Sequence, residues 1–161
     1  MNLNKIAIII PLLSILGCVP VKESHRPTQP TVHQDEFSRW VTTESPIVKI
    51  KSDDFYHLSY RFVSRRDKVT LEDGGTALLV TIKYFKNWRF YDTVTFQGGQ
   101  TFRINDVTRR TTTCTTYGCL FNEYLAIELS NDFIESHKNG FKVKLNSKFY
   151  QSTVIEVNEI L

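Results

Sequence analysis

From Pro46 to the end of the chain, apolar and polar residues alternate, and this stretch contains no further proline. The alternation is clearest at residues 56–63, where tyrosine, leucine, tyrosine and phenylalanine occupy every second position. A period of two places successive side chains on opposite faces of a strand. A proline inside such a strand would interrupt the hydrogen-bonded ladder. The pattern therefore predicts β-strands with one buried face.

Turn signals divide this region into seven or eight short strands. Residues 73–75 read Asp-Gly-Gly, and Gly98-Gly99 supplies the positive φ angles that a tight hairpin turn requires. Only residues 130–138 have the capping and charge pattern of a short helix. Many short strands with almost no helix predict an all-β fold over residues 46–161, mainly an antiparallel sandwich or a small barrel.

The first 45 residues differ from the rest. Lys5 precedes an apolar run, residues 6–17, that is too short for the roughly 20 residues of a membrane-spanning helix. A basic start and a short apolar core are typical of a secretory signal peptide. Residues 18–45 contain three prolines and few large apolar side chains, too few to offset the entropy lost on ordering. We therefore expect a signal peptide at 1–17, a flexible tether at 18–45 and one β-rich domain at 46–161.

Three apolar residues near the end of this tether, Phe37, Trp40 and Val41, have the i, i+3, i+4 spacing of a helix face. The spacing predicts a single helical turn that docks onto the domain. A partner-binding motif is the alternative interpretation.

The end of the apolar run has a specific composition, Leu-Ser-Ile-Leu-Gly-Cys at residues 13–18. It resembles the lipobox of bacterial lipoproteins, in which an aliphatic stretch ends in a small residue before cysteine. The resemblance implies cleavage after Gly17 and lipidation of Cys18 with acyl chains such as palmitate. Val19 stands where an aspartate retains Gram-negative lipoproteins in the inner membrane, which implies the outer membrane and a domain that faces the periplasm. Residues 114–161 also resemble small bacterial lipoproteins with an all-β domain, a similarity that implies no activity.

Once Cys18 is lipidated, Cys114 and Cys119 remain as a pair in a compartment that permits oxidation. Predicted strands flank both residues, so the pair lies across the neck of a four-residue hairpin loop and is predicted to form a structural disulfide. A redox-active dithiol and half of a metal site are the alternatives. The first lacks the two-residue spacing of thioredoxin-type motifs, and the second lacks a nearby histidine.

Few residues fit a catalytic pattern. The four histidines lack ligand spacing, so neither a metal site nor a cofactor is predicted, and phosphate-binding and nucleophile-elbow motifs are absent from the sequence. Asp92 and Glu123 stand out because each shares a strand face with apolar residues. Facing one cleft, they would act as general acid and base in a cell-wall glycan hydrolase. The alternative is a structural pair with Arg89, Arg103 or Arg109.

Basic and aromatic residues supply candidates for partner binding, namely Arg65, Arg66, Arg109, Arg110 and Tyr117. The net charge of +3 comes from 20 basic and 17 acidic residues, a mixture too even to indicate a nucleic-acid partner. The sequence favours a non-enzymatic, membrane-anchored lipoprotein whose β domain binds an envelope protein or polymer. A small-ligand or inhibitor-binding module is the alternative, ahead of the glycan hydrolase.

Overall fold

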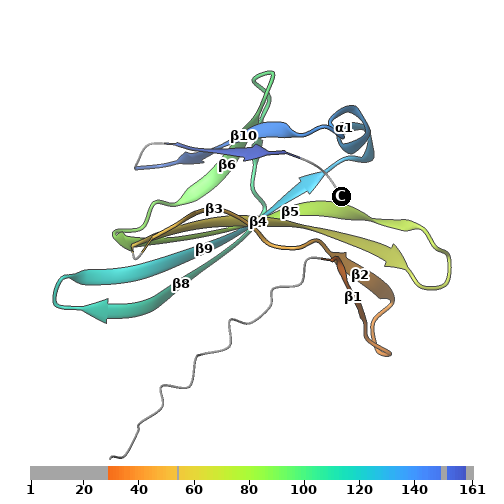
Figure 1. The fold of residues 1–161 in the computed structure, drawn as a ribbon, viewed down its shortest axis with the longest axis horizontal. Helices are drawn as coiled ribbons and strands as arrows, with labels where there is room; N and C mark the ends of the chain where they lie inside the picture. Colours follow the sequence, from red (N-terminus) through yellow and green to blue (C-terminus); the bar gives the residue numbers. More distant parts are fainter. Residues whose placement is uncertain (1–28, 54, 150–151, 159–161) are drawn as a thin grey trace, which may run out of the picture.

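The computed structural model describes residues 29–53, 55–149 and 152–158. Within them, eleven strands form two antiparallel sheets, and one short helix connects two of the strands (Figure 1). The predicted all-β fold is confirmed, and the two separate open sheets make it a sandwich rather than a small barrel. The predicted seven or eight strands are too few. Two further strands come from the expected tether, and the run expected at 101–113 divides where Ile104 turns into the core.

Seven strands form the larger sheet, with the order β1-β2-β4-β5-β9-β8 and with β3 on the same edge of β4 as β2. These strands are β1 (Thr31–Gln34), β2 (Trp40–Glu44), β3 (Val48–Ser52), β4 (Tyr56–Asp67), β5 (Asp73–Lys86), β8 (Asp106–Thr115) and β9 (Gly118–Leu129). The three long strands β4, β5 and β9 form its centre and pair in continuous registers apart from one irregularity in β4.

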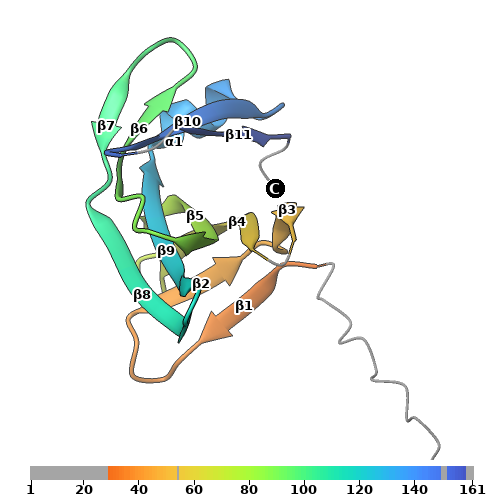
Figure 2. The same ribbon diagram turned by 90° about the vertical axis from the view of Figure 1, so that its left-hand side faces the viewer.

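Four strands form the smaller sheet, with the order β11-β10-β6-β7, and it lies across one face of the larger sheet (Figure 2). They are β6 (Tyr91–Phe96), β7 (Thr101–Arg103), β10 (Phe141–Ser147) and β11 (Thr153–Val157). The helix α1 (Asn131–Ser136) connects β9 to β10, within the predicted 130–138. Ser130 caps it by accepting a 3.2 Å hydrogen bond from the Phe133 N–H.

The core lies between the two sheets, and the alternation in the sequence accounts for it. Every second residue of the central strands faces inward, as Leu78, Val80, Ile82 and Tyr84 do along β5. The smaller sheet contributes its own inward face, with Val94, Val143, Leu145 and Ile155 all at most 1% exposed. The opposite face of the larger sheet is not covered by the smaller one, so we call it the outer face.

Residues 31–44 correct the expected tether and the expected helical turn. They form the antiparallel hairpin β1–β2, and β2 pairs with β4 from Trp40 opposite Asp67 to Glu44 opposite Val63. The Trp40 ring lies over Gly74, where an added Cβ would come within 2.6 Å of the ring. Because Gly74 has no side chain, there is room for the Trp40 ring to pack against the backbone at this position. Phe37 is 90% exposed in the hairpin turn and does not dock.

Asp67 attaches this hairpin to the turn between β4 and β5. Its carboxylate is 1% exposed, accepts hydrogen bonds from the N–H groups of Val69 (2.8 Å) and Thr70 (2.9 Å), and forms an ion pair with Arg39. These contacts, led by the Thr70 N–H and then by Arg39, hold the pKa of Asp67 well below its usual range. The ionised Asp67 side chain therefore accepts hydrogen bonds from the β4–β5 turn and binds Arg39 of the β1–β2 turn.

Because the pKa of Asp67 is lower in the folded state, the fold loses stability at acidic pH. The ionised Asp67 stabilises the folded state above the unfolded pKa of about 4, and this contribution is lost as the pH falls from there toward the folded value. We expect Asp67→Asn to lower the urea midpoint at pH 7, and we expect the difference from the natural protein to shrink at pH 3. Glu128→Gln, at an exposed position of β9, is the control. An Asp67→Asn difference of the same size at both pH values would contradict this role.

Candidate functional site

Glu123 is a fully buried carboxylate on the inward face of β9. Its Oε1 accepts hydrogen bonds from the Tyr84 hydroxyl and, at 3.0 Å, from the Phe90 N–H. Its Oε2 accepts from the Tyr91 N–H at 3.1 Å and from Nε of Arg109 at 2.9 Å. Both oxygens are therefore engaged by two donors each. Because Phe90 and Tyr91 lie where the chain enters β6, this carboxylate joins the larger sheet to the smaller one.

The groups around Glu123 are arranged to keep this contact. The Tyr84 hydroxyl is protonated and donates to this contact, and burial raises its pKa further above the ordinary value. Arg109 also donates from Nη2 to the Tyr91 carbonyl at 2.9 Å, and its guanidinium lies over the Phe90 ring at 5.2 Å. Phe90 has a φ of 54°, a left-handed conformation that is uncommon for residues other than glycine.

Asp92, the other candidate carboxylate, has a separate partner. Its Oδ2 lies 3.2 Å from Nζ of Lys148, and its side chain is 34% exposed. Glu123 pairs with Arg109, one of the three arginines proposed for this role from the sequence, whereas Asp92 pairs with a lysine. These contacts support the structural interpretation of Glu123, whose carboxylate is enclosed by its own donors.

The structure does not bring the five candidate partner-binding residues together. Arg65 and Arg66 are exposed near the C-terminal end of β4, whereas Tyr117 lies at the opposite end of the same sheet. Arg109 is bound to the buried carboxylate. Arg110 is exposed on the outer face of β8. Of the five, only Tyr117 lies among other exposed aromatic side chains.

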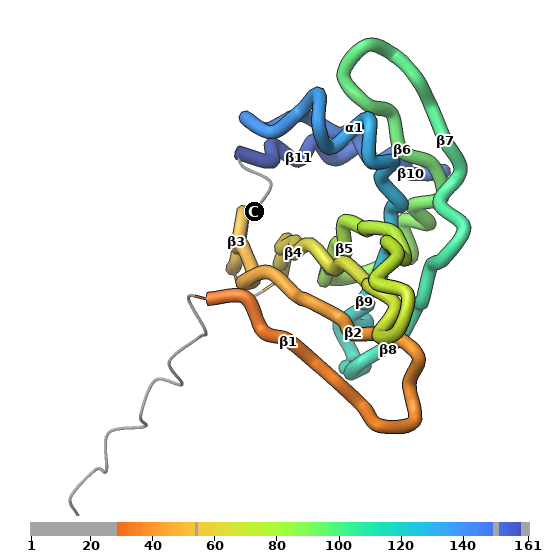
Figure 3. Tube along the Cα trace, turned by 90° about the vertical axis from the view of Figure 1, so that its right-hand side faces the viewer, coloured from red at the N-terminus to blue at the C-terminus, as the bar shows by residue number. Residues whose placement is uncertain are grey.

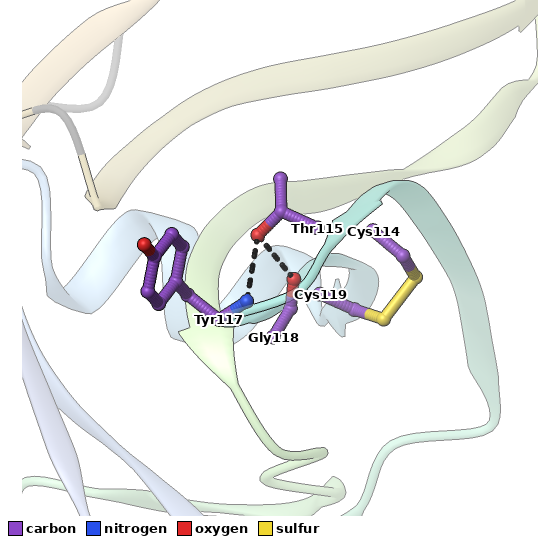
Figure 4. The surroundings of a disulfide bond; sticks show 5 residues. All are labelled: Cys114, Thr115, Tyr117, Gly118 and Cys119. Atoms are coloured by element: carbon purple, nitrogen blue, oxygen red, sulfur yellow. Dashed lines mark hydrogen bonds between the residues drawn. A yellow bond between two sulfur atoms is a disulfide. The ribbon is translucent and has the colours of Figure 1, made fainter.

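Tyr117 is presented by a hairpin that a disulfide closes (Figure 4). Cys114 and Cys119 are directly opposite each other in the ladder, with 4.0 Å between their Cα atoms, as the predicted pairing requires. The strands continue one pair further, so the turn is two residues long rather than the expected four. Thr115 Oγ1 accepts from the Tyr117 N–H and donates to the Gly118 carbonyl, both at 3.2 Å. Tyr117 is 87% exposed at the tip.

Four connections meet at this end of the sandwich, those between β3 and β4, β5 and β6, β8 and β9, and β10 and β11 (Figure 1). They present three largely exposed aromatic side chains, Phe55 (64%), Tyr117 (87%) and Phe149 (70%). Half-buried aromatic residues support them, namely Phe85, Trp88 and Phe90. We call these six residues the aromatic end.

Ring contacts connect five of the six residues of the aromatic end into two groups. Phe55 lies 5.7 Å from Phe85, and Phe149 lies 5.7 Å from Phe90, measured between ring centroids. Trp88 lies 6.0 Å from Phe90 and so extends the second group into the core. These contacts fix the exposed rings against partly buried ones. Sequence reasoning missed Phe55 and Phe149, because nothing local distinguishes them from core aromatics.

Positive charge accompanies the aromatic end. Lys86, at the end of β5, and Lys148, between β10 and β11, are both exposed, and Lys148 is paired with Asp92. The Arg89 guanidinium lies over the rings of Tyr84 and Tyr56, at 4.7 and 5.1 Å from their centroids. Burial raises the pKa of the Tyr56 hydroxyl. The end of the sandwich therefore combines aromatic side chains with an arginine, two residue classes that are enriched at protein interfaces.

Two hollows of the described surface lie away from this cluster. One, of about 280 Å³, lies on the outer face between Ile47, Leu79 and Tyr124. Another, of about 540 Å³, lies beside Arg65 and Arg66. Among the described residues, no three metal-binding side chains come together. Across residues 29–53, 55–149 and 152–158, no helix has both the length and the apolar composition needed to cross a membrane.

A scan against protein-family models finds no match, and comparisons with curated proteins and with solved structures find none either.

The buried carboxylate gives a sharp stability prediction. Glu123→Gln keeps the shape of the side chain but leaves Arg109 without its counter-charge, so we expect it to lower the free energy of unfolding by about 3 kcal/mol. The matched change Asp92→Asn removes a partly exposed ion pair and is expected to cost less than about 1 kcal/mol. Urea unfolding of both variants measures the difference. Equal losses would contradict the role assigned to Glu123.

Proposed function

We propose that this chain is a lipid-anchored protein of the cell envelope whose β domain binds an envelope protein or polymer through its aromatic end. The lipobox-like sequence at residues 13–18 supports the anchor and lies outside the described residues. The gathering of Phe55, Tyr117 and Phe149 at one end is the observation that carries the binding function.

Exposed aromatic rings at this density indicate a contact surface. Aromatic side chains bury a large area on binding and dominate the energetics of many interfaces. Tyr117 is held by a short turn and a neighbouring disulfide, so little conformational entropy is lost when it is covered. Lys86, which lies opposite Cys119 in the β5–β9 ladder, adds positive charge near Tyr117 and favours a partner that carries negative charge.

An anchor of this kind determines where the surface acts. A single acyl chain holds a protein to a bilayer only reversibly, whereas two or more make the attachment stable. By the sorting rule for Val19, we propose the outer membrane, with the domain in the periplasm. The protein would then meet its partner within reach of the membrane, without needing catalytic groups of its own.

The anchor can be tested separately from the binding surface. We expect Cys18→Ser to move the protein from the membrane fraction to the soluble fraction, because the thiol that accepts lipid is absent. Fractionation and mass spectrometry of the N-terminus measure this change. The Cys114→Ser, Cys119→Ser double variant controls for cysteine loss as such. A Cys18→Ser protein that stays in the membrane fraction would contradict the proposed anchor.

The binding surface can be tested by crosslinking mass spectrometry on intact envelopes. We expect Tyr117→Ser and Phe149→Ser each to lower the yield of the crosslinked partner about tenfold, because a central aromatic contributes more than about 1.4 kcal/mol to an interface. Phe37→Ser is the matched control, since Phe37 is 90% exposed in the β1–β2 turn, far from the aromatic end. Unchanged yields for the first two variants, or an equal loss for Phe37→Ser, would overturn the assignment.

A further inference from the structure

β8 forms an open edge of the larger sheet (Figure 2). It pairs with β9 on one side, and no described strand pairs with its other side. Eight of its ten residues are exposed, and five are threonine, a residue that favours extended structure. Figure 3 shows the chain from β7 entering β8 along this edge. An edge of this kind presents unpaired backbone N–H and C=O groups that another strand can bind.

The charged side chains of β8 are divided between its two faces. Asp106, Thr108 and Arg110 lie opposite residues of the outer face of β9, whereas Val107 and Arg109 lie on the inward side. Asp106 and Arg110 are exposed, and neither forms an ion pair with another described residue. Two opposite charges thus lie four residues apart on one face of a free edge.

We propose that two copies of this chain pair in antiparallel fashion along β8, about a two-fold axis at Thr108. In this register Asp106 of each copy lies directly opposite Arg110 of the other, so the contact contains two opposite-charge pairs. Directly opposite side chains in an antiparallel ladder are about 4.5–5.5 Å apart at Cβ, close enough for the charges to attract. The outer faces of the two larger sheets then become continuous.

Other registers that keep the outer faces together are less favourable. An axis at Arg109 places Arg109 of one copy opposite Arg109 of the other, and an axis at Arg110 does the same with Arg110. Like charges directly opposite each other are destabilising. An axis at Val107 leaves Arg110 beyond the strand of the other copy. Beyond Arg110, the irregularity between Thr111 and Thr113 disrupts the regular ladder. The first half of β8 is therefore the segment that can pair, and its charges select one register.

A contact of this length is small. Stable protein interfaces bury at least about 1,200 Å², and smaller ones belong to weak or transient complexes. We therefore infer a weak dimer, which is best detected by a covalent trap at the axis. The inference does not depend on the lipid anchor or on the aromatic end, so its test is independent of the proposed function.

Thr108→Cys in the purified full chain provides the trap. In the proposed register the two introduced thiols face each other at a distance that a disulfide spans, so mild oxidation should yield a dimer that peptide mapping assigns to residue 108. Thr112→Cys is the control on the same strand, because its two copies would lie about 27 Å apart along the ladder. Equal crosslinking at both positions would show random collision and overturn the proposal.

Charge exchange tests the register itself. In the Thr108→Cys background, we expect Asp106→Arg alone and Arg110→Asp alone each to lower the dimer yield at least tenfold, because each sets like charges opposite each other. Mixing these two variants restores both opposite-charge pairs and should restore crosslinking between them. Both positions are exposed, so urea midpoints should stay unchanged and show that folding is intact. Yields that ignore the charges, or a mixture that does not recover, would overturn the pairing.

Discussion

The contact between Glu123 and its four donors is the interaction on which the rest of the sandwich depends. A buried carboxylate is costly unless it is paired and hydrogen-bonded. Here the pairing partners come from β5, β8 and the entrance to β6, so satisfying one side chain brings both sheets together. The same contact holds Phe90 in its left-handed conformation and so positions the ring that Phe149 contacts. The join between the two sheets and the Phe90–Phe149 contact of the aromatic end therefore both depend on Glu123.

Asp67 applies the same chemistry at the opposite end of the larger sheet. It too is a buried carboxylate that accepts two backbone N–H groups and pairs with an arginine from a segment distant in sequence. By binding Arg39, it fixes the β1–β2 hairpin next to β4. Since β1 begins at Thr31, the tether of the proposed lipoprotein is shorter than the composition indicated, and the domain starts closer to its anchor.

The sequence predicted the strands of residues 46–161 because alternation reports directly on a one-sided core. The prediction was wrong for β1 and β2, because Val32, Val41 and their polar neighbours have the composition of a coil. The contact of Trp40 with Gly74 that packs this hairpin onto the sheet is visible only in the structure. The disulfide followed from spacing and flanking strands. The aromatic end could not be predicted, because its members lie in four connections and at the end of β5, which only the sheet topology brings to one place. Likewise, the partners of Glu123 become apparent only once the register of β9 is known.

The two parts of β8 constrain how a dimer and a partner could coexist. Its first half carries the complementary charges. Its second half contains the irregularity at Thr111–Thr113 and leads to the disulfide-closed turn that presents Tyr117. In an antiparallel pairing at Thr108, the two turns extend in opposite directions from the axis. The aromatic ends therefore face away from each other, and one flat surface cannot engage both. Since avidity requires that both sites reach the same target, such a dimer would connect two separate partners rather than bind one more tightly.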